Sequence, residues 1–370
     1  MKSNMTWHFA AVMTAALVLP LVAQNDTITM KDGSTKNGKV LDWNFKSVEV
    51  AVGGAGSTRI KAEDVASIAF DAVPKAMKEA DAAFSGGRDA EAIEKYRAII
   101  EDKKTRKPLM QDAWWKCAEA QRRTGKLEEA AETLKTMLNA GGFGESRYLV
   151  EADDLIPQWL IWAGKADAAA SFTSEEEARV GKLGVAGQGE RLKLWRARAL
   201  LAKGDTGKAG TEASALAGGS GTVAADAKVL LGTIALAGNK HEEAERLFRE
   251  AMAVTQTPSV RASCFAGLGE VLLARALKSK KPDEFKEALL CYLRPVVQYS
   301  PDAGGDTDAY AIALFGAGVC FQSIGELEKD AEKQKVSLSR ARENYRKLLD
   351  NFPNSPRAAE ARERLSRVGG

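Results

Sequence analysis

The sequence predicts a mainly α-helical protein, a solenoid of helical hairpins preceded by a small five-stranded β-barrel module. Three observations predict this fold class. Apolar and polar residues alternate between residues 26 and 71, which is the period of β-strands. From Pro74 onward the alternation gives way to Ala-rich amphipathic segments with the period of helices. A Gly and an Ala then recur at nearly constant intervals, which is typical of a repeat array.

Composition excludes several classes of function. The chain has 370 residues, of which 45% are hydrophobic, enough for a packed core in several domains or one elongated array. Its 53 Lys and Arg nearly balance its 50 Asp and Glu, so net charge gives no reason to expect nucleic acid as partner. Beyond the N-terminal segment the only His is His241, which leaves few general bases or metal ligands. We therefore expect no enzyme activity, no cofactor and no metal site.

Residues 1–23 are expected to be a secretory signal peptide. Lys2 precedes an apolar stretch from Phe9 to Val22, and Ala23 is a plausible residue before the cut. The stretch is shorter than the roughly 20 residues that a membrane-spanning helix needs, and no Cys follows it to carry a lipid. We expect no later segment long and apolar enough to span a bilayer. The sequence thus predicts a soluble periplasmic or secreted protein.

The four Cys residues are expected to be buried small hydrophobes. Each lies within a helical pattern among small or apolar neighbours, and none forms a CxxC pair. An oxidising compartment permits disulfides, so one pair deserves a test. The repeat register places Cys264 and Cys291 on the two helices of one hairpin, and whether they pair stays open.

The β-module spans residues 26–71. Its strand-like runs are separated by short turns, and five short strands favour a closed barrel because closure removes exposed edges. The spacing of Ile28, Asp32-Gly33, Gly38 and Val40 resembles the opening half of the Sm-like, SH3-like small barrels.

Sm-like barrels often bind RNA, but residues 26–71 hold six Lys and Arg against seven acids and so lack a basic surface. We therefore expect no nucleic acid partner. We interpret the module as a docking unit, or as the site through which the protein forms a homo-oligomer.

Residues 74–368 contain the repeats. A Gly stands five residues before an Ala four times, with these Ala residues at positions 92, 130, 169 and 209. Further along, Gly232, Ala244, Phe248 and Ala251 reproduce the spacings of twelve, four and three that mark the tetratricopeptide repeat family. The resemblance implies about seven stacked helical hairpins with a C-terminal capping helix. Small residues at Gly232 and Ala244 would let two helices approach, while Phe248 would fill the layer between neighbouring hairpins.

Two other candidate motifs are interpreted as structural. The acid run Glu175 to Glu177 lacks the alternating ligands of a hard-cation loop, so we expect a solvated helix end. The Gly-rich run from Gly218 to Thr222 follows no strand and lacks the Lys of a phosphate-binding loop. We expect it to link the fourth and fifth units.

The resemblance also implies a concave groove lined by the first helix of each hairpin. In the second to fourth units, the groove positions hold several large aromatic and Arg side chains, the types that dominate binding hot spots. The predicted partner-binding residues are Trp115, Arg122, Arg123, Gln158, Trp162, Arg191 and Arg198. The Lys and Asn with which some family members grip a peptide's C-terminal carboxylate are absent from these positions.

These observations favour a non-catalytic scaffold that binds a partner polypeptide in the groove. The pattern from Ala341 to Arg364 resembles periplasmic family members of cell-envelope complexes, which makes the envelope the expected setting. One alternative is an oligomeric structural protein assembled through residues 26–71. Another is an envelope hydrolase that uses carboxylates such as Glu151 and Asp154.

Overall fold

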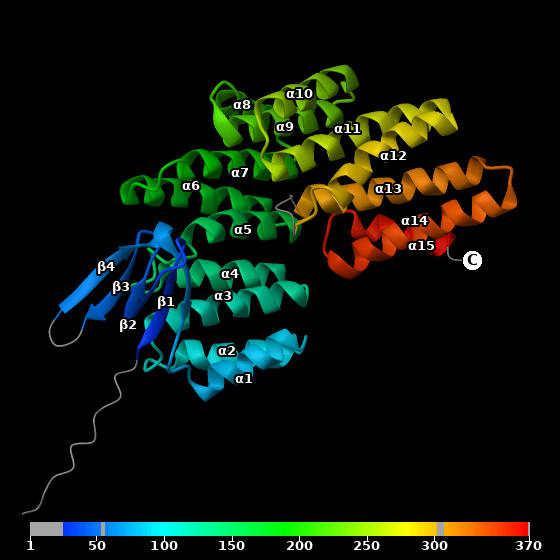
Figure 1. Ribbon diagram of the computed structural model, residues 1–370. Coiled ribbons are helices and arrows are strands. Elements are labelled where there is room, and N and C mark those ends of the chain that lie inside the picture. Colours follow the sequence, from blue (N-terminus) through cyan, green and yellow to red (C-terminus); the bar gives the residue numbers. More distant parts are fainter. Residues whose placement is uncertain (1–24, 53–55, 302–306, 369–370) are drawn as a thin grey trace, which may run out of the picture. The chain divides into compact units, whose positions relative to one another are not determined.

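A computed structural model describes residues 25–52, 56–301 and 307–368 of the chain (Figure 1). The chain divides into two compact units. One unit, within residues 1–42 and 46–73, holds the β-sheet, and the other, residues 43–45 and 74–370, holds the α-helices. The expected signal peptide, residues 1–23, lies outside the described residues.

The first unit is a five-stranded antiparallel sheet with the strand order β4-β3-β2-β1-β5. In the register of the sheet, Ile28 of β1 lies opposite Lys36 of β2 on one side and Ile68 of β5 on the other. The alternating pattern places apolar side chains such as Val40 and Val50 in the core of the sheet. The strands are β1 (Asp26–Met30), β2 (Thr35–Trp43), β3 (Ser47–Val52), β4 (Gly56–Lys61) and β5 (Val65–Ala69).

The sheet is not closed into a barrel, so our expectation of a barrel was wrong. β4 and β5 stand at the two ends of the strand order, and no ladder joins them within the described residues. Both strands bury a single side chain, Ile60 in β4 and Val65 in β5. A barrel needs inward-facing side chains from every strand to fill its interior, and these two edges supply too few.

The second unit consists of seven helical hairpins and a final single helix, fifteen α-helices among the described residues (Figure 1). We number the hairpins 1 to 7, so that α1 and α2 form hairpin 1 and α13 and α14 form hairpin 7. The helices are α1 (Lys75–Ser85), α2 (Asp89–Glu101), α3 (Lys107–Arg123), α4 (Leu127–Asn139), α5 (Leu149–Trp162), α6 (Ala166–Leu183), α7 (Gln188–Ala202), α8 (Thr206–Ala217), α9 (Gly221–Ala237), α10 (His241–Val254), α11 (Pro258–Ser279), α12 (Pro282–Val297), α13 (Thr307–Leu327), α14 (Ala331–Asn351) and α15 (Ala358–Val368).

The turns inside the hairpins explain the recurring Gly. In hairpins 1 to 4 the Gly of the Gly–Ala spacing adopts a φ between +72° and +90°, a conformation that glycine reaches without steric cost. The next amide then donates to a carbonyl five residues earlier, as from Arg88 to Ala83 at 2.9 Å and from Lys126 to Gln121 at 2.9 Å. In hairpin 5 the same position is taken by Asn239, with φ +57°.

A different glycine pattern holds the later hairpins together. A Cβ on Gly232 of α9 would lie 2.7 Å from the ring of Phe248, and one on Gly267 of α11 would lie 2.3 Å from it. The ring of Phe248, on α10, therefore fits between two glycines of the flanking helices, as expected for Gly232. Tyr292 occupies the same kind of space between Gly269 and Gly316. The sequence did not indicate Gly267, Gly269 or Gly316.

α13 corrects one expectation. By length and composition it is the one helix in the described part of the chain that is long and apolar enough to cross a membrane, although we expected none. However, 67% of its most apolar window is buried, because α13 packs within the array. Such burial is typical of a core helix.

Three further expectations can be compared with the structure. The four cysteines are free thiols, so Cys264 and Cys291, on α11 and α12 as expected, are not joined. The acid run is not wholly solvated: Glu176 is buried in α6, where it accepts hydrogen bonds from Arg179. Desolvation of this carboxylate is offset by the adjacent guanidinium. The Gly-rich run after Gly218 does connect α8 to α9.

Candidate functional site

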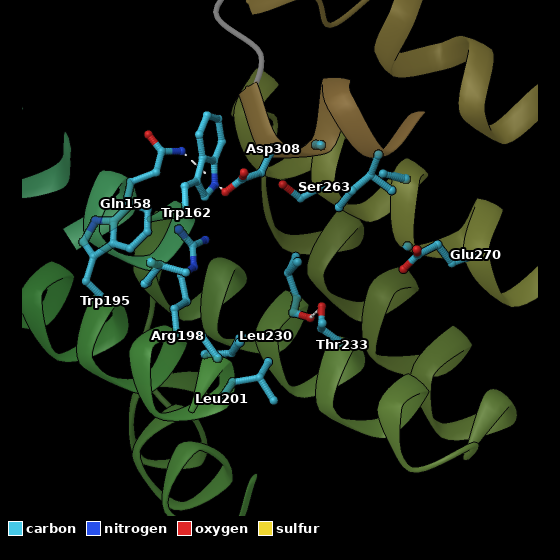
Figure 2. A pocket seen from close by; sticks show the side chains of 17 residues that line it. Gln158, Trp162, Trp195, Arg198, Leu201, Leu230, Thr233, Ser263, Glu270 and Asp308 are labelled. Atoms are coloured by element: carbon cyan, nitrogen blue, oxygen red, sulfur yellow. Dashed lines mark hydrogen bonds between the residues drawn. The ribbon is translucent and has the colours of Figure 1, made fainter. Parts of the chain in front are cut away.

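The first helices of five consecutive hairpins, α5, α7, α9, α11 and α13, line a pocket of about 260 Å³, which we call the central pocket (Figure 2). This volume lies just below the range of ligand pockets, about 300 to 1,000 Å³. Most of the lining is apolar: Ile161, Trp162, Trp195, Leu201, Ala202, Val229, Leu230, Ala266, Gly267, Ala309 and Ile312. The central pocket therefore suits a bulky apolar side chain better than a large cofactor.

Polar contacts hold one aromatic side chain, Trp195, and one basic side chain, Arg198, in place at one end of the central pocket. The indole nitrogen of Trp195 donates to Asp154 Oδ1 at 2.8 Å. The Arg198 guanidinium lies 4.5 Å from the centre of the Trp195 ring and pairs with Asp226 at 3.3 Å. Figure 2 shows Arg198 beside Trp195, with Glu270 on the far side of the pocket. A stacked, paired guanidinium loses little freedom when a ligand arrives.

The remaining polar side chains of the central pocket have partners within the chain. Thr233 donates to the carbonyl of Val229 at 3.1 Å, and Ser263 donates to that of Ser259 at 3.1 Å. Glu270 accepts a hydrogen bond from Arg357. A ligand that relies on these groups would have to replace existing contacts, so the wall favours apolar contact.

α13 reaches the central pocket from the far end of the array. Gln158 of α5 donates to Thr307 Oγ1 at 3.3 Å and to Asp308 Oδ2 at 3.4 Å, and these residues lie 149 and 150 positions further along the chain. We call this the closing contact. Hairpins 3 and 7 therefore lie side by side, although three hairpins separate them in the sequence.

Three of the seven residues predicted to bind a partner line the central pocket: Gln158, Trp162 and Arg198. Arg191, one helical turn before Trp195, instead pairs with Asp154. It supports the carboxylate that orients the Trp195 ring and does not line the pocket.

Trp115 belongs to an aromatic stack elsewhere in the helical unit. Its ring lies 4.4 Å from that of Tyr148 and almost parallel to it. The Arg147 guanidinium lies 4.4 Å from the centre of the Tyr148 ring and 3.8 Å from the centre of the Trp43 ring. Trp115 is thus held by aromatic contacts within the chain, and the structure does not bring it to the central pocket.

Arg122 and Arg123 line a second pocket, of about 230 Å³, together with Trp162 and residues 350–354, the end of α14 and the start of the loop after it. Both are paired: Arg122 with Glu119 at 2.9 Å, and Arg123 with Asp89 at 3.3 Å. Trp162 lines both pockets, so it separates the site of the two arginines from the central pocket.

The pocket residues of hairpins 5 to 7 were missed by sequence reasoning. Gln158 and Arg198 stand eleven residues before the Ala of their repeats, Ala169 and Ala209. The same count from Ala244 gives Thr233, which lines the central pocket. In hairpins 6 and 7 the longer helices interrupt this count, so Glu270 and Ile312 carry no comparable signal.

The carboxylates proposed for hydrolysis do not form an acid–base pair. Asp154 is engaged by Arg191 and Trp195, and Glu151 is exposed. Burial, and next the charge of Glu176, raises the pKa of the neighbouring Asp153 to about 9. Asp153 is fully buried and accepts from Gln188 at 3.2 Å, outside the central pocket. No group of three metal-ligating side chains occurs among the described residues.

Comparison with known proteins agrees with the hairpin architecture. Residues 77–145 match the sequence model of the tetratricopeptide repeat family. The matched stretch spans α1 to α4, the first two of the seven hairpins. No curated protein sequence matches the chain.

Several solved structures are similar at low sequence identity. A tetratricopeptide repeat protein from Parabacteroides merdae is 14% identical, with 80% of this chain and 98% of that chain covered and a TM-score of 0.46. The apo form of the quorum sensor NprR from B. thuringiensis is 8% identical, with 80% and 86% covered and a TM-score of 0.46. A complex of yeast Sti1 is 16% identical, with 80% and 98% covered and a TM-score of 0.29. These similarities carry no conclusion about ligand or partner.

Proposed function

We propose that the protein is a non-catalytic scaffold that binds a partner polypeptide by accepting one of its bulky apolar side chains in the central pocket. The observation that carries this proposal is the convergence of five first helices on one apolar pocket with two tryptophans in its wall. Tetratricopeptide repeats support an interaction role, since their stacked hairpins create extended concave binding surfaces.

The energetics favour an aromatic or branched aliphatic side chain as the anchor. Full burial of such a side chain contributes about 1.5 to 3 kcal/mol, and clustered Trp and Arg residues are the usual hot spots of interfaces. Arg198 lies beside Trp195 in the wall of the central pocket, where the partner's main chain would run. A guanidinium suits main-chain carbonyls, while the interior of the pocket suits the side chain.

A pair of matched peptides tests this proposal. Blocked Gly-Gly-Phe-Gly-Gly should bind weakly, near the millimolar range expected for one anchor, and Gly-Gly-Ala-Gly-Gly at least tenfold more weakly. Saturation-transfer NMR measures both. Thr233→Trp, which fills the central pocket, and Trp162→Ala with Arg198→Ala should abolish the preference for Phe. Arg122→Ala, outside the central pocket, is the control. Equal binding of both peptides would refute the proposed site.

We propose further that the protein works outside the cytoplasm, in a cell-envelope complex, after removal of residues 1–23. The charged start and the short apolar stretch of the sequence support this location. N-terminal sequencing of the protein isolated from its host tests it. A mature N-terminus near residue 24 is expected, whereas an intact Met1 on cytoplasmic protein would exclude it.

The open sheet supports a second candidate, self-assembly through residues 26–71. β4 and β5 are the edge strands, and an edge strand can pair with a strand of another chain. Light scattering should then show a mass that rises with concentration and that falls to the monomer when residues 26–71 are deleted. A monomer at all concentrations would exclude this candidate.

A further inference from the structure

The central pocket has walls from distant parts of the chain. α5 supplies Gln158, Ile161 and Trp162, while α13 supplies Asp308 and Ile312. Figure 2 shows Asp308 beside Gln158 and Trp162. If hairpin 7 moved away from hairpin 3, the pocket would lose one wall and would open to solvent.

A second contact joins the same two parts of the array. A Cβ on Gly125, in the turn between α3 and α4, would lie 3.3 Å from the side-chain amide atoms of Asn354, in the loop before α15. Asn354 also lines a pocket with Trp162 and Leu127. The loop that follows hairpin 7 therefore lies against hairpins 2 and 3, near the closing contact.

These contacts differ in kind from those between neighbouring hairpins. The closing contact is polar and includes two hydrogen bonds, at 3.3 and 3.4 Å, from one amide. Neighbouring hairpins instead share buried rings such as Phe248, which has 1% exposure. Hydrogen bonds exchanged with water contribute little net stability, whereas buried rings contribute much. The polar closing contact thus contributes less stability than the buried rings between neighbours.

We propose that closure of hairpin 7 onto hairpin 3 assembles the central pocket, so that ligand binding and closure favour each other. This inference rests on the proposed function, since it requires the central pocket to have a ligand. A ligand shifts such an equilibrium only by its differential affinity for the two states. A ligand side chain that touches both α5 and α13 has that differential affinity, because in the open state it can no longer contact both helices at once.

A disulfide across the second contact can lock the closed state. The pair Gly125→Cys and Asn354→Cys is suited to this, in a Cys291→Ser background that removes the one native thiol that is not buried. Gly125 has φ +82°, so Cys at this position brings backbone strain, but the oxidised and reduced proteins share that strain and their comparison is unaffected. The probe is blocked Gly-Gly-Phe-Gly-Gly. We expect the oxidised protein to bind it at least fivefold more tightly than the reduced protein.

A charge change can weaken the closed state. Gln158→Glu places a carboxylate against Asp308 and should weaken binding of the probe at least fivefold. The disulfide should restore binding to within twofold of the oxidised parent, which a direct loss of a Gln158 contact would not allow. Gln256→Glu is the matched control, since Gln256 is exposed and contacts Arg261 away from the pocket.

The outcomes separate the two proposals. Equal affinity of the oxidised, reduced and Gln158→Glu proteins would overturn the coupling and leave the proposed function intact. Absence of binding in every form, including the locked one, would overturn both. Failure of the disulfide to form in the native protein would show that the two turns do not meet and would overturn the coupling, and the matched peptides would still test the proposed function separately.

Discussion

Two parts of the helical array differ in how their neighbouring helices meet. In hairpins 1 to 4, polar pairs between helices, such as Lys116 with Asp81 at 2.7 Å and Arg196 with Glu177 at 2.7 Å, accompany an apolar core that includes Leu134 and Trp159. In hairpins 5 to 7, the rings of Phe248, Tyr292 and Tyr345 lie against glycines of the first helices.

The use of glycine differs in the same way. In hairpins 1 to 4 glycine serves the backbone, because it takes the left-handed conformation of the turn. In hairpins 5 to 7 glycine serves packing, because any Cβ at Gly267 or Gly316 would overlap a ring. The same hairpin architecture is therefore compatible with two uses of glycine, and the sensitivity of the two parts to mutation and pH should differ.

The largest effect is expected at the ring itself. Phe248→Ala removes a side chain with 1% exposure from between three helices, and should lower the free energy of unfolding by about 3 to 5 kcal/mol. Urea unfolding followed by circular dichroism measures this loss. A loss below about 1 kcal/mol would mean that the ring does not hold hairpins 5 and 6 together.

The opposite change should also destabilise this part. Gly267→Ala adds a Cβ 2.3 Å from the Phe248 ring, and overpacking of this kind costs about 1 to 3 kcal/mol. Gly210→Ala, in α8 with open space around it, is the control and should stabilise by about 0.5 to 1 kcal/mol. The same urea titration compares them. Equal effects would show that helix propensity, not ring packing, governs both positions.

Features that recur at fixed spacing could be predicted from the sequence, whereas features outside the repeat register could not. The turn glycines and Phe248 recur at fixed spacing, so the hairpins could be predicted. Gly267 has no such spacing, because the longer helices of hairpin 6 shift it out of register. The meeting of Gln158 with Thr307 depends on small rotations summed over several hairpins, which local pattern does not contain. Trp115 was assigned to the groove from its position in the repeat, and that position does not show that its ring stacks on Tyr148, just before α5.

The polar part should respond to pH. The pKa of Asp153 is raised to about 9 in the folded state, against about 3.9 in unfolded chains. Its contribution to stability is therefore full below about pH 4 and is lost as pH rises to about 9. Asp153→Asn removes this dependence and keeps a polar group beside Gln188. At pH 8 the variant should be more stable than the parent, by an amount on the order of 1 kcal/mol.

The control for pH comes from the aromatic part. The stability lost in Phe248→Ala should be the same at pH 5 and pH 8, since Phe248 does not titrate. Thermal unfolding from pH 5 to pH 8 measures both variants. If the stability difference between Asp153→Asn and the parent does not change with pH, the buried carboxyl is ionised at low cost. The expected difference in pH sensitivity between hairpins 1 to 4 and hairpins 5 to 7 would then be wrong.

The smallest effect is expected at a turn glycine. Gly204 has φ +90° and no atom within 4 Å of an added Cβ, so Gly204→Ala should destabilise by about 1 kcal/mol through backbone strain alone. Gly204→Asn should cost less than Gly204→Ala, because Asn tolerates the left-handed conformation, as Asn239 does in hairpin 5. Urea midpoints of the two variants decide the matter. If the backbone conformation is the reason for glycine, Gly204→Asn should be more stable than Gly204→Ala. Equal stability of the two variants would contradict this explanation.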